Sequence, residues 1–303
     1  MLGKVVIFGV GLIGGSFARA LKKADAVGTI VGMGRSAASL ARAQELGLID
    51  IIGDGSGDGL RAALDGADLV LIAAPVAQTE KILAALAPHL HPGTVVTDAG
   101  STKTDVVAAA RRALQGKLAQ FVPGHPIAGR ESNGPDAAID DLYQGKKTVL
   151  TPLAENAPAD VERVAAAWRL CGAIIHRLTP EEHDKVFAAV SHLPHLLAYA
   201  LVDDIANKPH ADLLFQYAAS GFRDFTRIAA SSPEMWRDIS LANQGALLGE
   251  LDAYMAQLTR LRDHLATGDG AGIEAVYANA QRARRQWIEA IESAEPAAPR
   301  DQT

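Results

Sequence analysis

Short apolar runs alternate with alanine-rich amphipathic stretches along the first 180 residues. The runs cover residues 5–8, 29–31, 69–72, 94–97 and 120–122. Most of their residues are apolar and β-branched at consecutive positions, which is typical of strands buried on both faces of a sheet. The stretches between them have helical periodicity. The pattern predicts a parallel sheet covered by helices, which is a doubly wound α/β domain of the Rossmann type.

The pattern changes after Thr179. Two further apolar runs, 148–150 and 173–175, flank a helical stretch over 158–170, and we expect these runs to extend the same sheet. From Thr179-Pro180-Glu181-Glu182 onward, long helical periodicities take over. This tetrapeptide combines an N-cap threonine, proline at the first helical position and a glutamate at the third, which predicts a helix start. We therefore predict an α/β domain over 1–179, an all-helical domain over 180–293 and a flexible tail over 294–303.

Composition and charge narrow the class of protein. The 303 residues are 49% hydrophobic and 21% charged, which predicts a soluble globular protein of about two domains. The net charge of −6 argues against a nucleic-acid partner. The single cysteine, Cys171, predicts a reducing compartment and a buried apolar role, and we expect the cytoplasm. The longest uninterrupted apolar runs fall short of the roughly 18 residues of a membrane span, so no membrane partner is expected.

A glycine-rich turn follows the first predicted strand and opens a helix. It reads Gly9-Val10-Gly11-Leu12-Ile13-Gly14. The first glycine permits a tight turn, the second lets the backbone approach a pyrophosphate, and the third lets helix and strand pack closely. The strand–turn–helix context favours a dinucleotide-binding site over an ordinary turn. The expected cofactor contacts in this region and at the end of the later strand 69–72 are Gly9, Gly11, Leu12, Ile13, Gly14, Ala74 and Pro75.

The end of the second predicted strand bears on the choice of cofactor. NAD-binding domains usually carry a carboxylate there for the ribose hydroxyl, but this chain has Gly34, followed by Arg35 and Ser36. Arg35 can pair with a 2′-phosphate and Ser36 can donate to it, so NADP is favoured. The alternative is NAD, with Arg35 as a solvated loop residue.

Polar clusters follow two later strands, at 98–103 and 124–131, and we expect both to face one crevice. His125 in the second cluster is a candidate general base, because the pKa of histidine lies near neutrality. Ser101 in the first cluster is a candidate to orient His125 or to bind the same substrate hydroxyl. The alternative for His125 is a structural histidine that satisfies buried backbone groups.

The helical half carries a second set of candidates. Two histidines, His192 and His195, lie three apart, and two arginines, Arg223 and Arg227, lie four apart, so on one helix the arginines would share a face. Neighbouring aromatic residues lead us to expect that an apolar interior draws in at least one arginine, which would then hold an anion. No third ligand accompanies the histidines at zinc-like spacing, so no metal is expected.

Taken in order, these segments resemble the prephenate/arogenate dehydrogenase family of tyrosine biosynthesis. The resemblance covers nearly the whole chain and includes 182–184 and 221–236 as well as the segments above. It implies an NAD(P)-dependent oxidoreductase that oxidatively decarboxylates prephenate, arogenate or both, to 4-hydroxyphenylpyruvate or tyrosine. It also implies a homodimer formed through the helical substrate domain. Since few residues remain for a regulatory domain, feedback by tyrosine is expected to act at the active site itself.

The resemblance also assigns residue roles. It makes His125 the residue that polarises or deprotonates the ring C4 hydroxyl, with support from Ser101, and it makes Arg227 the clamp on a substrate carboxylate, with His195 beside it. The other substrate-site positions that it implies are Glu131, Arg223, Asp224 and Trp236, some of them reaching across the dimer. Relatives commonly have a small residue at the position of Arg130, which here either contacts the substrate's side-chain carboxylate or points to solvent.

Two other functions fit the α/β prediction. A β-hydroxyacid dehydrogenase would use a helical lysine for proton transfer, and neither Lys185 nor Lys208 has the context of that lysine. A non-catalytic NADP-binding redox sensor would bind the cofactor without turnover. A turnover assay with prephenate and arogenate distinguishes these functions.

Overall fold

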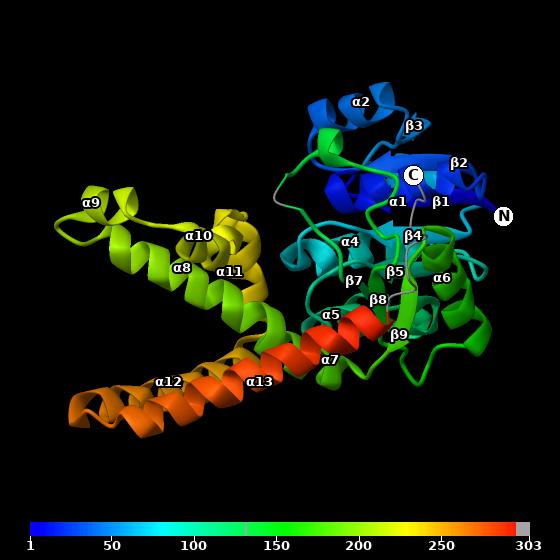
Figure 1. The fold of residues 1–303 in the computed structure, drawn as a ribbon. Coiled ribbons are helices and arrows are strands. Elements are labelled where there is room, and N and C mark those ends of the chain that lie inside the picture. Colours follow the sequence, from blue (N-terminus) through cyan, green and yellow to red (C-terminus); the bar gives the residue numbers. More distant parts are fainter. Residues whose placement is uncertain (131, 295–303) are drawn as a thin grey trace, which may run out of the picture. The chain divides into compact units, whose positions relative to one another are not determined.

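The computed structural model describes residues 1–130 and 132–294 (Figure 1). The strands are β1 Leu2–Phe8, β2 Val27–Met33, β3 Ile51–Ile52, β4 Leu69–Ile72, β5 Val95–Asp98, β6 Phe121–Val122, β7 Gly124–Pro126, β8 Lys147–Leu150 and β9 Ile174–Arg177. The helices interspersed with these strands are α1 Leu12–Lys23, α2 Ala37–Glu45, α3 Gly57–Leu64, α4 Thr79–Leu86, α5 Thr104–Leu114 and α6 Pro158–Leu170.

The all-helical part of the chain begins at α7, where the sequence predicts a helix start. Its helices are α7 Pro180–Phe187, α8 Leu193–Ala206, α9 Ala211–Gln216, α10 Ser220–Thr226, α11 Pro233–Ala242, α12 Gln244–Thr267 and α13 Gly270–Ala294. Shorter turns include η1 Val76–Gln78, the π-helical segment η5 Ala188–His192 and the 3₁₀ turn η6 Arg227–Ala230. Thr179 caps α7 as predicted: its hydroxyl accepts from the amide of Glu182 at 3.1 Å, and the Glu182 carboxylate accepts from the amide of Thr179 at 2.9 Å.

The main sheet has six parallel strands in the order β3-β2-β1-β4-β5-β6. The strand order reverses between β1 and β4, since one crossover runs outward on each side of β1. Ligands of such sheets bind beyond the carboxyl ends of the strands at this reversal. The predicted doubly wound α/β fold is therefore confirmed.

A second sheet of three strands, in the order β7-β8-β9, shares no strand pairing with the first. The expectation that runs 148–150 and 173–175 extend the main sheet is wrong, because β8 pairs antiparallel with β7 and parallel with β9. Pro123 separates β6 from β7, and proline cannot donate to a strand ladder. A three-residue apolar run predicts a strand but does not specify its neighbour, so the sequence pattern did not distinguish one sheet from two.

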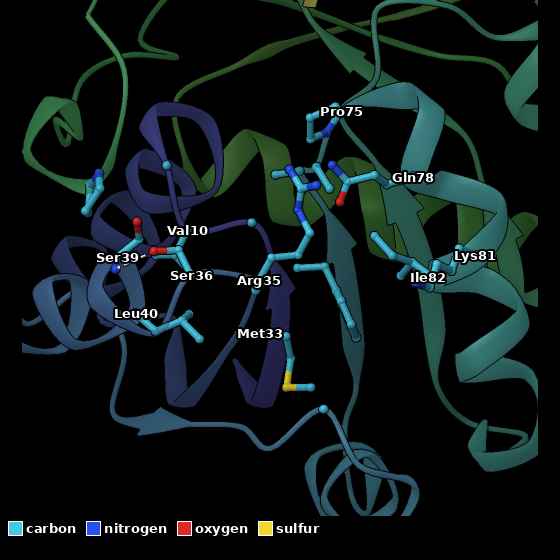
Figure 2. A pocket seen from close by; sticks show the side chains of 18 of the residues that line it. Val10, Met33, Arg35, Ser36, Ser39, Leu40, Pro75, Gln78, Lys81 and Ile82 are labelled. Atoms are coloured by element: carbon cyan, nitrogen blue, oxygen red, sulfur yellow. Dashed lines mark hydrogen bonds between the residues drawn. The ribbon is translucent and has the colours of Figure 1, made fainter. Parts of the chain in front are cut away.

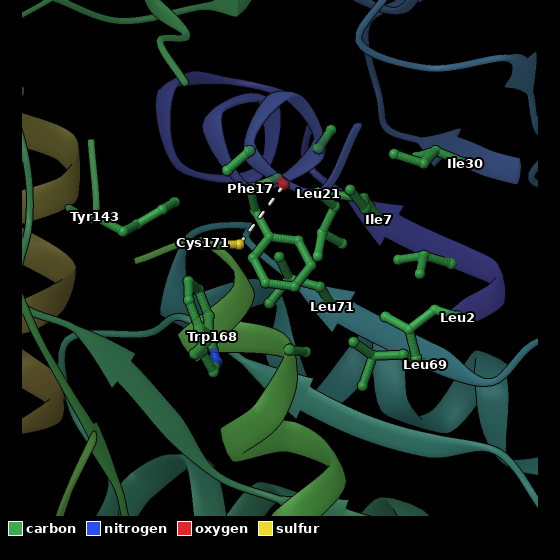
Figure 3. Packing of buried hydrophobic residues seen from close by; sticks show 14 of the residues in the cluster. Leu2, Ile7, Phe17, Leu21, Ile30, Leu69, Leu71, Tyr143, Trp168 and Cys171 are labelled. Carbon is green, nitrogen blue, oxygen red and sulfur yellow. Dashed lines mark hydrogen bonds between the residues drawn. The ribbon is translucent and has the colours of Figure 1, made fainter. Parts of the chain in front are cut away.

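Two apolar clusters cover the two faces of the main sheet. The first joins the sheet to α1 and α6, and the second joins it to α3, α4 and α5. In the first cluster the rings of Phe17 and Trp168 pack edge to face with centroids 4.7 Å apart, and Tyr143 packs on Trp168 at 5.1 Å (Figure 3). Cys171 is buried beside them, and burial raises the pKa of its thiol. The expected apolar role of this cysteine is confirmed.

The chain separates into two compact units, Met1–Leu247 and Leu248–Thr303. The first unit includes the helices α7 to α11, because α7 contacts α5 and α11 contacts η1. A functional domain boundary at Thr179 therefore remains a prediction. Of the predicted tail, Ala294 ends α13 and residues 295–303 lie outside the described residues.

One helical run among the described residues, Pro180–Ala206, is long and apolar enough to cross a membrane. The apolar runs of the sequence did not predict it. His183 and Asp184 in its first turns are buried and hydrogen-bonded to other residues of the first unit. We interpret the run as a helix of the protein's own fold, because those buried polar contacts would be lost in lipid.

Candidate functional site

A cavity of about 770 Å³ opens at the carboxyl ends of β1, β2 and β4 (Figure 2). Six of the predicted cofactor contacts line it, namely Gly9, Gly11, Arg35, Ser36, Ala74 and Pro75. The predicted residues Leu12, Ile13 and Gly14 form the first turn of α1 and are not among the lining residues. Only their backbone amides, at the positive end of the helix, remain candidates for phosphate contact.

The glycine-rich turn has the geometry that a dinucleotide requires. Gly9 has φ of +90°, and a Cβ there would lie 2.5 Å from the carbonyl oxygen of Ala73. A Cβ on Gly14 would lie 2.2 Å from the carbonyl oxygen of Gly9, so helix and strand pack closely. A Cβ on Gly11 would meet no described protein atom within 4 Å, which leaves room for a pyrophosphate. The hydroxyl of Tyr143 donates to the carbonyl of Ile13 at 2.6 Å and holds this first turn in place.

Two cations are among the residues that line the cavity. Among the described residues that line it, the charged ones are Arg35 and Lys81, and no carboxylate is among them. Figure 2 shows the Arg35 side chain projecting into the pocket. Ser36 caps α2, with its hydroxyl accepting from the amide of Ser39 at 3.1 Å, and that hydroxyl keeps its own proton to donate. Lys81 lies on α4 and was not predicted from the sequence, because nothing local marks a helical lysine as a ligand.

His125 lies on β7 and is joined to a second imidazole. Its Nδ1 lies 2.8 Å from Nε2 of His183, and Nδ1 of His183 lies 2.8 Å from Oδ1 of Asp184. Ser101 was predicted from the sequence to orient His125, but the hydrogen-bonded partner in the structure is His183. Burial holds the pKa of His125 well below its usual range, and the nearby His183 and Lys103 lower it further. His125 is therefore neutral at physiological pH.

A buried ion pair brings the two predicted polar clusters together. The ammonium of Lys103 lies 2.5 Å from Oδ2 of Asp98 and donates to the carbonyl of Gly124 at 2.7 Å. Lys103 and Asp98 are almost fully buried. Because Gly124 precedes His125, this pair fixes the strand that carries the candidate base.

The helical segment of the first unit, residues 180–247, supplies a second cluster around Trp236. His195 stacks on Trp236, with ring centroids 3.5 Å apart at 18°. Burial lowers the pKa of His195, and the charge of the nearby Arg227 lowers it further. His192 is buried between the two clusters, where burial lowers its pKa to about 4.

Asn243 and Ser101 connect these clusters. The amide of Asn243 donates to the backbone carbonyl of Asp184 at 2.8 Å and lies 3.1 Å from Nδ1 of His192. Ser101 makes its contact with His192 through its backbone. Asn243 carries no sequence signal, since it lies far along the chain from every residue that it contacts.

The expectation about the arginines is wrong in two respects. Arg223 lies on α10, which ends at Thr226, and Arg227 begins the turn η6, so the two are not on one α-helix. Both side chains are exposed, because the apolar residues around them are not covered within this chain; Phe225 is 53% exposed. Arg130 and Asp224 are also exposed, and Glu131 lies outside the described residues.

The helical segment reaches the cofactor pocket at η1. Helix α11, which carries Trp236, packs against η1, and Gln78 of η1 lines the cavity. Within the described residues, no group of three or more His, Cys, Asp or Glu side chains is placed to hold a metal ion. The arrangement offers a nucleotide pocket, a neutral imidazole acceptor and a guanidinium beside stacked rings, which together suit hydride and proton removal from an anionic substrate.

Comparison with known proteins agrees with this geometry. Residues 17–177 match the family described as prephenate dehydrogenase, nucleotide-binding domain, and residues 179–278 match the prephenate dehydrogenase dimerization domain. Cyclohexadienyl dehydrogenase of Zymomonas mobilis is 38% identical over 282 residues, covering 92% of this chain and 94% of that protein. Prephenate dehydrogenase of Bacillus subtilis is 36% identical over 274 residues, covering 89% of this chain and 72% of that protein.

A solved structure shares the whole fold. Prephenate dehydrogenase from A. aeolicus, in complex with hydroxyphenyl propionate and NAD+, superposes with a TM-score of 0.87 at 36% identity. The match covers 95% of this chain and 99% of that one. On the family matches, the identities and the shared fold, this chain is an oxidoreductase that belongs to the prephenate dehydrogenase family.

Proposed function

We propose that this enzyme oxidatively decarboxylates prephenate, arogenate or both in tyrosine biosynthesis. The observation that carries the proposal is His125, a neutral imidazole held by a hydrogen bond on its Nδ1 side, on a strand that the buried Asp98–Lys103 pair fixes to the end of β5. Family membership supports this reaction over that of a β-hydroxyacid dehydrogenase. The lysine beside His125, Lys103, is also unsuited to the rival chemistry, since it is buried in an ion pair.

The residues divide the chemistry between them. His125 accepts the proton of the ring C4 hydroxyl through Nε2 as C4 becomes a ketone carbon. Bound NADP or NAD supplies the acceptor for the hydride. Loss of the ring carboxylate as carbon dioxide then gives an aromatic ring, so the protein mainly has to hold the dianion in line. Ser101 is assigned as a second polar contact for the hydroxyl.

The substrate's carboxylates are assigned to the cluster around Trp236. Arg227 is the bidentate clamp, supported by His195, which stacks on Trp236. The further substrate contacts that we propose are Arg130, Glu131, Arg223 and Asp224.

NADP is the favoured cofactor, because Arg35 and Lys81 are the charged residues among those described around the cavity. A 2′-phosphate would meet two cations there, whereas the ribose hydroxyl of NAD would find no carboxylate among those described residues. The A. aeolicus relative was solved with NAD+, so the preference of this enzyme needs its own measurement.

A homodimer formed through the helical segment completes the proposal. The exposed apolar residues of that segment include Leu213, Leu214, Phe215, Tyr217 and Phe225, and the matching family domain is a dimerization domain. A surface of this kind is typical of a subunit interface. The expected compartment is the cytoplasm.

The test is a steady-state assay of both substrates with both cofactors, following reduced nicotinamide absorbance. We expect turnover with at least one substrate and a higher kcat/KM with NADP than with NAD. The variant His125→Asn should lower kcat by about 100-fold or more, the scale of general-base loss, with little change in KM. Cofactor binding without turnover of either substrate would reject the enzyme function, and near-normal turnover by His125→Asn would reject the role of His125.

A further inference from the structure

A hydrogen-bonded row of side chains runs from His125 on β7 to the start of α7. It passes from Nδ1 of His125 to Nε2 of His183, and from Nδ1 of His183 to Oδ1 of Asp184, with 2.8 Å at each step. We infer that His183 and Asp184 are positioning residues that hold His125 in the tautomer with its proton on Nδ1 and its acceptor lone pair on Nε2. The inference rests on the proposed role of His125 and deepens it.

The tautomer of His125 can be deduced by following the hydrogen bonds from the Asp184 carboxylate to His183 and then to His125. Oδ1 of Asp184 also accepts from the amide of Lys103 at 2.8 Å, and an ionised carboxylate can only accept. Nδ1 of His183 must therefore carry a proton. In a neutral ring its Nε2 is then a bare acceptor, so the contact with His125 requires a proton on Nδ1 of His125. Nε2 of His125 is left as the free base.

Burial and the nearby charge of Lys103 lower the pKa of both rings, whereas Asp184 and Asp98 raise that of His183. Asp98 at the end of β5 is paired with Lys103 before α5, and His192 lies on η5. Burial is the main cause that lowers the pKa of His183, and it outweighs the opposing hydrogen bond to Asp184. Burial disfavours ionised Asp184, but the hydrogen bonds from His183, Thr104 and Lys103 outweigh it and lower its pKa. A charged His183 would instead force the opposite, non-accepting tautomer on His125.

The row is rigid at both ends. Asp184 accepts from the amide of Thr104 at 2.8 Å and from its hydroxyl, and the backbone carbonyl of Asp184 accepts from Asn243. The ring of Phe187 packs on His125 with centroids 4.9 Å apart and on His183 at 4.4 Å. A base held this firmly needs little reorganisation when the substrate binds.

The test compares two substitutions at His183, which touches no expected substrate group. His183→Gln keeps an oxygen that can accept from Nδ1 of His125, whereas His183→Phe fills the space without an acceptor. We expect His183→Gln to retain kcat within about fivefold and His183→Phe to lose about 100-fold, with KM for substrate and cofactor nearly unchanged in both. His176→Phe, on the exposed edge strand β9, is the matched control and should leave kcat unchanged.

The pH profile separates positioning from simple structural damage. Without an acceptor on Nδ1, the imidazolium form of His125 loses a stabilising hydrogen bond, so the acid limb of kcat/KM should move to lower pH in His183→Phe and stay near its wild-type position in His183→Gln. Equal kcat and equal pH profiles in the wild type and His183→Phe would overturn the inference about His183. If His125→Asn is slow in the same assay, the proposed function still stands.

Ring ¹⁵N NMR of the wild-type enzyme near pH 7.5 tests the tautomer without any turnover. The His125 signals are identified by their loss in His125→Asn. We expect the proton of His125 on Nδ1, and a proton on Nε2 would overturn the inference even in an active enzyme. This measurement also decides the matter if His183→Phe does not fold. Failure of the wild type to turn over either substrate would reject the proposed function alone.

Discussion

The α/β region, residues 1–179, and the helical segment 180–247 of the first unit differ in how they bury apolar surface. Apolar clusters cover both faces of the sheet in the α/β region, and the rings of Phe17 and Trp168 are fully buried. In the helical segment Phe215, Tyr217 and Phe225 are 40%, 77% and 53% exposed. A single chain therefore completes the cofactor pocket, whereas the segment proposed to hold the substrate leaves an apolar surface that a second subunit is expected to cover.

The largest expected effect comes from breaking the core of the α/β region. Phe17→Ala removes a ring that packs on Trp168 and borders Cys171. The surrounding sheet and helices are held by their other contacts and cannot move inward to fill the cavity that the ring leaves. We expect the free energy of unfolding to fall by about 3–5 kcal/mol, measured from the first transition of the urea denaturation curve.

Phe225→Ala is the matched control in the helical segment. Its ring is half exposed in one chain, so at concentrations where the protein is monomeric its free energy of unfolding should stay within about 1 kcal/mol of wild type. At higher protein concentration the Phe225→Ala substitution should weaken dimerisation, as measured by analytical sedimentation. A loss as large as that of Phe17→Ala in the monomer would contradict the difference between the two regions.

The next effect is on the pH dependence of stability, where the two regions meet. Histidine in the unfolded chain takes up a proton near pH 6.5, while burial lowers the pKa of folded His192 to about 4. Between these pH values the unfolded state binds a proton that the folded state does not bind. Stability contributed by neutral His192 is therefore present above pH 6.5 and is lost as pH falls toward 4, by about 3 kcal/mol in all.

His192→Asn tests this dependence, because its amide oxygen can still accept from Asn243 but does not titrate. Urea denaturation at pH 7.5, 6 and 5 should show a smaller loss of stability in the variant than in the wild type. Parallel losses in both proteins would mean that His192 is not responsible.

The smallest expected effect is on the choice between NADP and NAD in the cofactor pocket. Arg35→Ala should weaken NADP binding by about 10- to 100-fold, the scale of a lost charge-assisted hydrogen bond, and leave NAD binding and the KM of the substrate almost unchanged. Fluorescence titration with both cofactors measures this, and Lys81→Ala repeats it from α4. Equal losses for NAD and NADP would show that Arg35 does not recognise the 2′-phosphate.

Local patterns predicted the elements well and their partners less well. The runs at 69–72 and 158–170 became β4 and α6 with the same bounds, because four consecutive apolar residues favour a buried strand and helical periodicity over 13 residues favours a helix. The runs at 148–150 and 173–175 became strands of a separate sheet. Strand pairing is a contact between distant residues, so a short apolar run does not determine it.

The same distinction holds for the candidate site. His125 was found because it follows a strand end within a polar cluster, and Gly9 and Gly14 because their spacing is required by backbone geometry. His183 belongs to a segment on which the family resemblance rests, yet its contact with His125 depends on how α7 packs against β7. Lys81 and Asn243 gave no local signal, and their roles come from the residues that face them.

The sequence by itself determined the fold class, the nucleotide-binding turn, the helix start at Thr179 and the candidate base, because each depends on residues close together in the chain. Only the tertiary structure decided that the later strands form their own sheet, that neither arginine is buried within this chain, and that His183 rather than Ser101 holds His125. These features arise from contacts between residues far apart in the chain, where geometry and burial select one partner among many of the same chemical type.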